Sequence, residues 1–296
     1  MLLTMKEILD RASKEGYAVA APNVDNELNA RACIEAAEEK NAPLILDVAY
    51  SMTADINLLG KILRDLAIQS KVPVAINLDH GATKEQVVRA IQSGFTSVMF
   101  DRSAKPFDEN VKEVKEIVDI AHLIGVSVEA ELGHVGQADN YANDRDAALT
   151  SPAEAVDYIN KTGVDCLAVA IGTAHGAYPK GFTPYLDFDR LVEIKKAVNG
   201  LPLVLHGSSG TNEEDIKKAC QLGINKVNIA NDLCRAAVDA VKDGNFDGNK
   251  AYDVYDAILV GVKNKLMHMI DVYGSTGKAW EVSPKGIPAK VLGGRE

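Results

Sequence analysis

The sequence predicts a (β/α)₈ barrel of the TIM type with extra C-terminal helices, formed by a single domain that spans residues 1–296. Eight short apolar runs alternate with amphipathic stretches of helical spacing. Apolar strands that are separated by helices are typical of a parallel sheet buried on both faces. Eight such units need about 250 residues, which leaves residues 244–296 for the extra helices. No low-complexity linker or shift in composition divides the chain.

The expected strands and helices follow one another in regular order. The eight strands are expected at residues 18–24, 43–49, 72–78, 96–100, 126–132, 165–171, 201–205 and 224–229. Stretches such as TKEQVVRAIQSG and DENVKEVKEIVDIAHLIG supply the helices, and several of them end in a glycine, as helix C-caps do. The N-terminal stretch MLLTMKEILDRASKEG has helical periodicity with charges inside it, so it predicts a helix and not a signal peptide.

Composition and charge exclude several classes of protein. The formal net charge is −10 and no cluster of Lys and Arg is present, which argues against a nucleic-acid partner. No apolar run approaches the roughly 18 residues of a membrane span. The four cysteines, Cys33, Cys166, Cys220 and Cys234, form no CxxC pair. They indicate reduced thiols, and we expect a cytoplasmic protein without a membrane partner.

Three of the predicted strands close on the same pair, histidine followed by glycine. The segments are AINLDHGAT (75–83), AVAIGTAHGAY (168–178) and LPLVLHGSSG (201–210). The carboxyl ends of barrel strands meet at one mouth, so we expect His80, His175 and His206 to converge there. A lone histidine at a strand end is more often structural, but three of them favour a metal site. Three protein ligands and an open position are the pattern of catalytic zinc.

The remaining acids and histidines near these segments are less specific. Asp79 precedes His80 directly, and adjacent residues of a strand point to different sides, so an acid/base role fits Asp79 better than a metal ligand. His122 and His268 lie in helical stretches and are interpreted as surface or packing residues. His134, beyond the fifth strand, stays undecided.

The loops after strands seven and eight predict a phosphate site, because such loops bind phosphate through backbone N–H groups in many barrels. The residues involved are Gly207, Ser208, Ser209 and Gly210 in HGSSG, and Asn228, Ala230 and Asn231 in KVNIANDL. The residues alone therefore predict a metal-dependent barrel enzyme that acts on a phosphorylated small molecule. Lyase, isomerase and hydrolase chemistry stay open at this point.

The motifs together resemble the class II, metal-dependent ketose-phosphate aldolases, which include fructose- and tagatose-bisphosphate aldolases. The matching segments are NLDHGAT, SVMFDRS, GVSVEAELGHVG, LAVAIGTAHGAY, PLVLHGSSG and KVNIANDL. The resemblance implies reversible cleavage of a ketose 1-phosphate or 1,6-bisphosphate to dihydroxyacetone phosphate and an aldehyde. It also implies a homodimer or homotetramer.

The resemblance further assigns roles to individual residues. His80, His175 and His206 would bind one catalytic Zn²⁺, and Asp101 and Glu131 would lie near an alternative metal position. Asp79 would take the proton of the C4 hydroxyl, Asn228 would hydrogen-bond the enediolate, and Asp139 would exchange a proton. The phosphate and substrate residues would be Asn23, Gly176, Lys180, Gly207, Ser208, Ser209, Asn228, Ala230 and Asn231. A monovalent cation, Na⁺ or K⁺, is a further expectation.

The chain departs from the family pattern where bisphosphate aldolases hold the distal phosphate. A hydroxyl residue is replaced by Ala49 and a basic residue by Cys234. Arg235 is rotated by about 100° on a helix relative to its neighbour, whereas Tyr50, Ser51 and Arg102 remain as substitutes. We therefore expect a ketose phosphate without the distal phosphate as substrate.

Three alternatives to a zinc aldolase remain open on the residues. A Schiff-base aldolase needs a lysine at the barrel mouth, but Lys226 sits at the entrance of strand eight. A metal-dependent hydrolase or epimerase would share the histidines, although it would usually recruit more carboxylates or a bridging lysine. A non-catalytic barrel would have no reason to keep Asp79, the three His-Gly ends and the Gly/Ser loop together.

Overall fold

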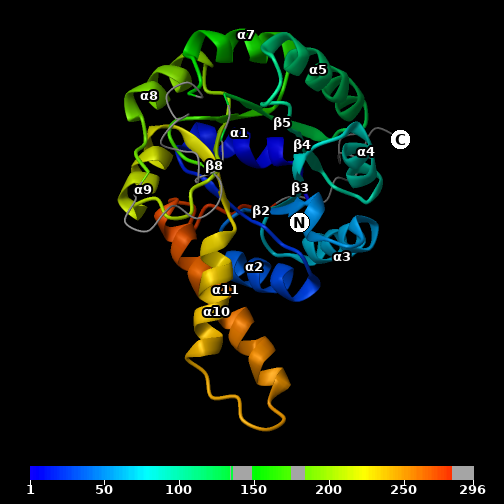
Figure 1. Cartoon of the computed structure of the whole chain (residues 1–296), viewed down its shortest axis with the longest axis vertical. Helices are drawn as coiled ribbons and strands as arrows, with labels where there is room; N and C mark the ends of the chain where they lie inside the picture. Colours follow the sequence, from blue (N-terminus) through cyan, green and yellow to red (C-terminus); the bar gives the residue numbers. More distant parts are fainter. Residues whose placement is uncertain (134, 136–148, 175–183, 282–296) are drawn as a thin grey trace, which may run out of the picture.

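The computed structural model describes residues 1–133, 135, 149–174 and 184–281. Eight parallel strands pair in sequence order and close into a barrel, with β8 beside β1 (Figure 1). The strands are β1 (Val19–Pro22), β2 (Leu44–Ala49), β3 (Val74–Gly81), β4 (Ser97–Phe100), β5 (Ser127–Leu132), β6 (Cys166–Val169), β7 (Leu203–Leu205) and β8 (Ile224–Ile229). Each lies within or overlaps one of the expected runs. The predicted fold class is confirmed.

The helices surround the barrel and extend it at one side (Figure 1). They are α1 (Met5–Glu15), α2 (Glu27–Glu39), the 3₁₀ turn η1 (Tyr50–Met52), α3 (Ile56–Gln69), α4 (Lys84–Gln92), α5 (Phe107–Leu123), α7 (Pro152–Thr162), α8 (Phe188–Ala197), α9 (Glu213–Leu222), α10 (Asn231–Lys242) and α11 (Ala251–Val272). Capping explains several ends: Thr4 and Glu7 form a capping box on α1, and Gly16 and Gly163 end helices in the left-handed conformation.

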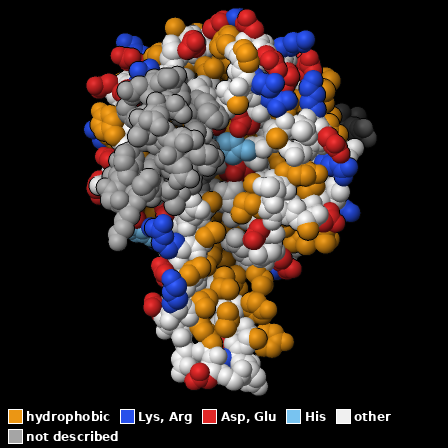
Figure 2. Space-filling view, in the orientation of Figure 1, with side chains coloured by type: hydrophobic (Ala, Val, Ile, Leu, Met, Phe, Trp, Pro, Cys, Tyr) orange, Lys and Arg blue, Asp and Glu red, His pale blue; other side chains and the backbone are white. Residues whose placement is uncertain are grey.

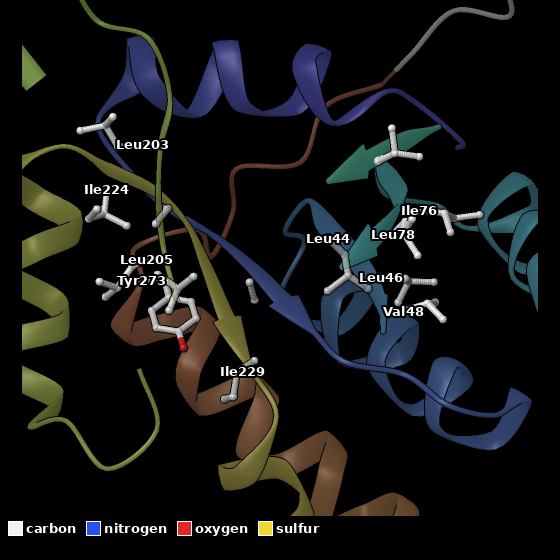
Figure 3. Close-up of a cluster of buried hydrophobic side chains, with 14 of the residues drawn as sticks. Leu44, Leu46, Val48, Ile76, Leu78, Leu203, Leu205, Ile224, Ile229 and Tyr273 are labelled. Carbon is white, nitrogen blue, oxygen red and sulfur yellow. The ribbon is translucent and has the colours of Figure 1, made fainter. Parts of the chain in front are cut away.

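The main hydrophobic core lies between the barrel and its helices. Alternate strand residues face outward, among them Leu44, Leu46, Ile76 and Leu78, and all four are fully buried (Figure 3). Burying one such side chain contributes roughly 1.5–3 kcal/mol. The near-continuous apolar strands that predicted a sheet covered on both faces are explained by this layer.

Inside the barrel, the N-terminal end is closed by α1. Its residues Met5, Ile8, Leu9 and Ala12 pack against inward-facing side chains of the strands, namely Val19, Ala21, Ile45, Ala75, Cys166, Ala168 and Val204. The helix was expected from its periodicity, whereas its position as the floor of the barrel was not. Above this floor, the inward-facing residues are polar.

The C-terminal helices α10 and α11 lie side by side and project from the barrel as an arm (Figure 1). Beyond the arm the chain returns to the barrel, where Ala18 N–H donates to the carbonyl of Tyr273 at 3.1 Å. The expected extra C-terminal helices are therefore present. Among the helices described, none combines the length and hydropathy that crossing a membrane requires.

Candidate active site

The strand tips bring the predicted residues together at one mouth of the barrel. Asn23 follows β1, Asp79 and His80 end β3, His206 follows β7, and Asn228 lies in β8. All five line one pocket, together with Gly207, Ser208, Ser209, Ala230 and Asn231. Figure 2 shows a histidine side chain near the middle of this face of the barrel.

Two adjacent residues, Asp79 and His80, face this pocket although strand alternation predicts opposite sides. The backbone of His80 has a φ of 49°, in the left-handed region, and the pairing of β3 with β4 shifts register between Leu78 and Gly81. This irregularity turns the imidazole back toward the mouth. Gly81 is required next, because a Cβ there would lie 2.6 Å from the carbonyl oxygen of Met99.

The two imidazoles turn one nitrogen each toward the other. His80 Nε2 and His206 Nδ1 are 3.0 Å apart, while the remaining nitrogens contact carboxylates: His80 Nδ1 lies 2.8 Å from Asp101 Oδ2, and His206 Nε2 lies 2.8 Å from Glu129 Oε1. An ionised carboxylate only accepts, so each ring donates an N–H to its carboxylate. The two facing nitrogens are close enough to share one cation, either a proton or a metal ion.

Asp79 accepts hydrogen bonds from two amide side chains. Asn23 Nδ2 donates to its Oδ2 at 2.8 Å and Asn228 Nδ2 donates to its Oδ1 at 3.0 Å. Burial favours the neutral acid, but positive charge on His80 and His206 outweighs it and lowers the pKa of Asp79 to about 2. The carboxylate is therefore an oriented anion beside the imidazoles, with Oδ1 3.8 Å from His80 Nε2.

A second acidic group lies on the other side of His80. Side-chain atoms of His80, Asp101 and Glu131 all lie within 4.8 Å of one another, and so do those of Asp79, His80 and His206. Burial, followed by the charge of Asp101, raises the pKa of Glu131 to about 8. Asp101 and Glu131 thus lie next to His80, and the alternative metal position that the resemblance implies for them stays a prediction.

Below the pocket lies a group of buried charges that the sequence did not predict. Lys226 Nζ is 2.9 Å from Glu129 Oε2 and 3.0 Å from Asp47 Oδ2. Burial opposes the charge of Lys226, but the two carboxylates outweigh it and raise the lysine pKa above its ordinary value. A Schiff-base lysine needs the opposite shift. Lys226 is the third residue of β8 and points into the barrel.

The loops expected to hold phosphate line the same pocket. Gly207 has a φ of 66°, and a Cβ there would lie 2.4 Å from the carbonyl oxygen of Ala174. Helix α10 begins after Ala230, which makes no side-chain cap, so the first N–H groups of this helix adjoin the pocket. Uncapped N–H groups at a helix start favour an anion.

Other predicted residues lie elsewhere. His175, Gly176, Lys180, Asp139 and His134 fall outside the described residues. His122 Nε2 lies 2.8 Å from Asp165 Oδ2, and His268 Nε2 lies 2.8 Å from Glu213 Oε2, away from the mouth. These two histidines are surface residues, as interpreted.

The comparisons with known proteins agree with this geometry. The family model described as "Fructose-bisphosphate aldolase class-II" matches residues 3–278. The chain belongs to the class II fructose-bisphosphate aldolase family. It is a class II aldolase, a carbon–carbon lyase, and this family implies a divalent metal and a sugar-phosphate substrate.

Individual relatives of this aldolase cover nearly the whole chain. A fructose-bisphosphate aldolase of Thermus caldophilus is 40% identical over 306 aligned positions, which cover 94% of this chain and 100% of the relative. The crystal structure of the YdjI aldolase of Escherichia coli K12 is 35% identical, with a TM-score of 0.85 over 95% of this chain and 100% of that one. A fructose-bisphosphate aldolase of Campylobacter jejuni, 23% identical with a TM-score of 0.79 over 94% and 96%, shares the fold.

Proposed function

We propose that the protein is a zinc-dependent aldolase that cleaves a ketose 1-phosphate to dihydroxyacetone phosphate and an aldehyde. The observation that carries the proposal is the approach of His80 Nε2 to His206 Nδ1, 3.0 Å apart, while the other nitrogen of each ring contacts a carboxylate. Neutral imidazoles whose other nitrogen donates to a carboxylate are the usual zinc ligands. His175 would be the third ligand, as the family resemblance implies.

Each group at the pocket would perform a different part of the reaction. Zinc, when bound, would polarise the ketose carbonyl as a Lewis acid. As the C3–C4 bond breaks, the C4 hydroxyl loses its proton to Asp79, a carbonyl forms at C4, and the electron pair stays with the three-carbon fragment. Asp79 suits this step because two amides fix the plane of its carboxylate beside His80.

Asn228 would bind the same fragment while it orients Asp79. Its Nδ2 donates to Asp79, and its Oδ1 has no hydrogen-bond partner among the described residues although it is buried. An unsatisfied buried acceptor costs free energy, and a substrate hydroxyl would relieve it. The 1-phosphate would then fall against Gly207, Ser209 and the start of α10.

The aldehyde half of the substrate is proposed to be uncharged at its far end. A groove of about 440 Å³ adjoins the pocket through Asn23 and Ala230. Its remaining described lining is Asp25, Asn26, Glu27, Leu28, Asn29, Met52, Leu233, Cys234, Ala237, Tyr255, Ile258, Leu259 and Val262, without a lysine or arginine. The two acids would repel a second phosphate, and the apolar wall would offer it neither a hydrogen bond nor a counter-charge.

The substitutes for a distal phosphate site do not reach this groove. Arg235 is not among the described lining residues, in agreement with the rotation of one helical position. Arg102 forms an ion pair with Glu113, donates to the carbonyl of Ala82 at 2.9 Å and stacks on Phe100. This arrangement supports a monophosphate as the better substrate.

The test is release of dihydroxyacetone phosphate from a panel of ketose 1-phosphates and 1,6-bisphosphates, with and without a chelator. We expect chelator-sensitive release that zinc restores, with a higher kcat/KM for a monophosphate. Equal or better turnover of the bisphosphates would reject the uncharged distal end and leave the aldolase. A Schiff-base adduct trapped by borohydride would reject the zinc mechanism.

A further inference from the structure

The buried charges below the pocket form a chain that ends at a proposed zinc ligand. Lys226 Nζ lies 2.9 Å from Glu129 Oε2, and Glu129 Oε1 lies 2.8 Å from His206 Nε2. All three side chains have an exposed fraction of 0%. A single carboxylate, that of Glu129, therefore links the lysine to the histidine that follows β7, inside a barrel whose N-terminal end is closed by α1.

We propose that Lys226 and Glu129 are positioning residues for His206: the ammonium holds the carboxylate, and the carboxylate holds the ring with Nδ1 toward the pocket. The inference rests on the proposed function, in which His206 binds zinc through Nδ1. A carboxylate that accepts from one ring nitrogen fixes both the tautomer and the rotation of the ring. Hydrogen bonds on the carboxylate itself keep it in place, and here Lys226 makes one.

A buried carboxylate cannot perform this task alone. Removing the partner of a buried charge leaves it uncompensated in a medium of low dielectric constant, and the group then moves or rearranges. Without Lys226, Glu129 Oε2 has no hydrogen-bond partner among the described residues. The two residues are therefore expected to act as one unit on His206.

Asp47 supplies an internal control for this unit. Its Oδ2 contacts the same Lys226 at 3.0 Å, while its Oδ1 accepts from Asn77 Nδ2 at 2.9 Å. No hydrogen bond joins Asp47 to either histidine in the part of the chain that the structure describes. Asp47→Asn and Glu129→Gln therefore each remove one carboxylate from the same buried lysine, and Glu129→Gln alone also changes the partner of His206.

The experiment measures zinc affinity of the full chain by competition with a chromophoric chelator, for the wild type, Glu129→Gln, Lys226→Met and Asp47→Asn. We expect Glu129→Gln and Lys226→Met to bind zinc about 10–100-fold more weakly, the usual effect of losing a residue that orients a ligand, and Asp47→Asn to change affinity by less than about threefold. Melting temperatures should fall in all three. In ¹⁵N spectra of the metal-free chain, His206 Nδ1 should keep its pyridine-type shift in wild type and Asp47→Asn only.

The outcomes separate this inference from the proposed function. Unchanged zinc affinity in Glu129→Gln, or an equal loss in Asp47→Asn, would overturn the positioning role and leave only charge balance in the barrel. A wild-type chain that binds no zinc would instead reject the proposed function. If Lys226→Met does not fold, the comparison of Glu129→Gln with Asp47→Asn decides alone.

Discussion

Asp79 is the residue on which the proposed proton transfer depends, and its replacement separates chemistry from metal binding. In Asp79→Ala the two amides of Asn23 and Asn228 lose their acceptor, and no group remains to take the hydroxyl proton. We expect kcat to fall by roughly 10²–10⁴-fold, the range for a general base. Zinc content should stay at the wild-type level. Loss of the metal in this variant would make Asp79 a ligand.

Gly207 is a residue whose backbone, not its side chain, shapes the site. In Gly207→Ala the new Cβ would lie 2.4 Å from the carbonyl oxygen of Ala174, at a φ of 66°. The two strains should destabilise the fold by roughly 1–3 kcal/mol in chemical denaturation and raise KM, because the phosphate loop must move.

Gly16→Ala is the matched control for this substitution. Gly16 has a similar φ of 72°, and a Cβ added there would meet no atom within 4 Å, so we expect a cost of about 1–2 kcal/mol and no change in KM. An equal change in KM for both variants would refute the role of the close approach at Gly207.

At the residue scale, the sequence predicts side chains at strand tips better than side chains inside the barrel. His80, Asp79 and Asn228 follow from apolar runs that end in polar residues, because the barrel topology alone brings strand ends together. Glu129 and Lys226 lie within such runs. The contact between their side chains depends on strand register and barrel closure. Neither pattern nor spacing encodes that register. The orientation of His80 toward the pocket depends on a local irregularity in strand pairing, and the sequence does not reveal this irregularity either.

At the scale of elements, α1 closes the N-terminal end of the barrel. Weakening its packing should therefore lower the stability of the fold without changing catalysis. Leu9 is fully buried among inward-facing strand residues at the end opposite the mouth. Leu9→Ala should lower the free energy of unfolding by about 2–5 kcal/mol, with kcat of the folded enzyme unchanged. The exposed Lys14→Ala is the control, expected within about 0.5 kcal/mol of wild type. A fall in kcat for Leu9→Ala would show that the floor and the mouth are coupled.

Two residues of helix α10, one turn apart, line different parts of the proposed substrate site. Asn231 lines the pocket and Cys234 lines the groove. In Cys234→Arg a guanidinium would enter the groove wall and could pair with a distal phosphate. The ratio of kcat/KM for a 1,6-bisphosphate over the monophosphate should rise by about tenfold or more, since a charged hydrogen bond contributes about 1.5–3 kcal/mol. Cys234→Leu fills similar space without charge and should leave the ratio unchanged. The same rise in both variants would assign the effect to size.

The positions of the strands and helices along the chain were predictable from the sequence, whereas the place of α1 in the barrel was not. Strands and helices follow from hydrophobic periodicity and end at caps, which are local properties of the chain. The position of α1 under the barrel is a non-local property, because it depends on small residues such as Ala21, Ala75 and Ala168 from distant strands. The single domain over residues 1–296 stays a prediction.

At the scale of the whole molecule, the arm formed by α10 and α11 is the surface on which we expect a second copy of the chain. It projects from the barrel and carries hydrophobic side chains on its face (Figures 1 and 2). Tyr252 is 81% exposed, Val260 54% and Val238 51%. Clustered exposed apolar residues mark association surfaces, and aromatic residues are enriched in them. One face of one arm can meet the same face of another only through a two-fold axis, which gives a closed dimer.

Charge on that face should therefore separate the copies. In the double variant Val238→Asp/Tyr252→Asp, two carboxylates would be buried against a partner without a counter-ion, which costs several kcal/mol per ion. Light scattering should report a homo-oligomer for the wild type and a monomer for the variant. Lys61→Asp, on the exposed side of α3, changes surface charge without touching the arm and should leave the mass unchanged. An oligomer that survives the double variant would place the interface elsewhere on the barrel, and a monomeric wild type would reject the second copy altogether.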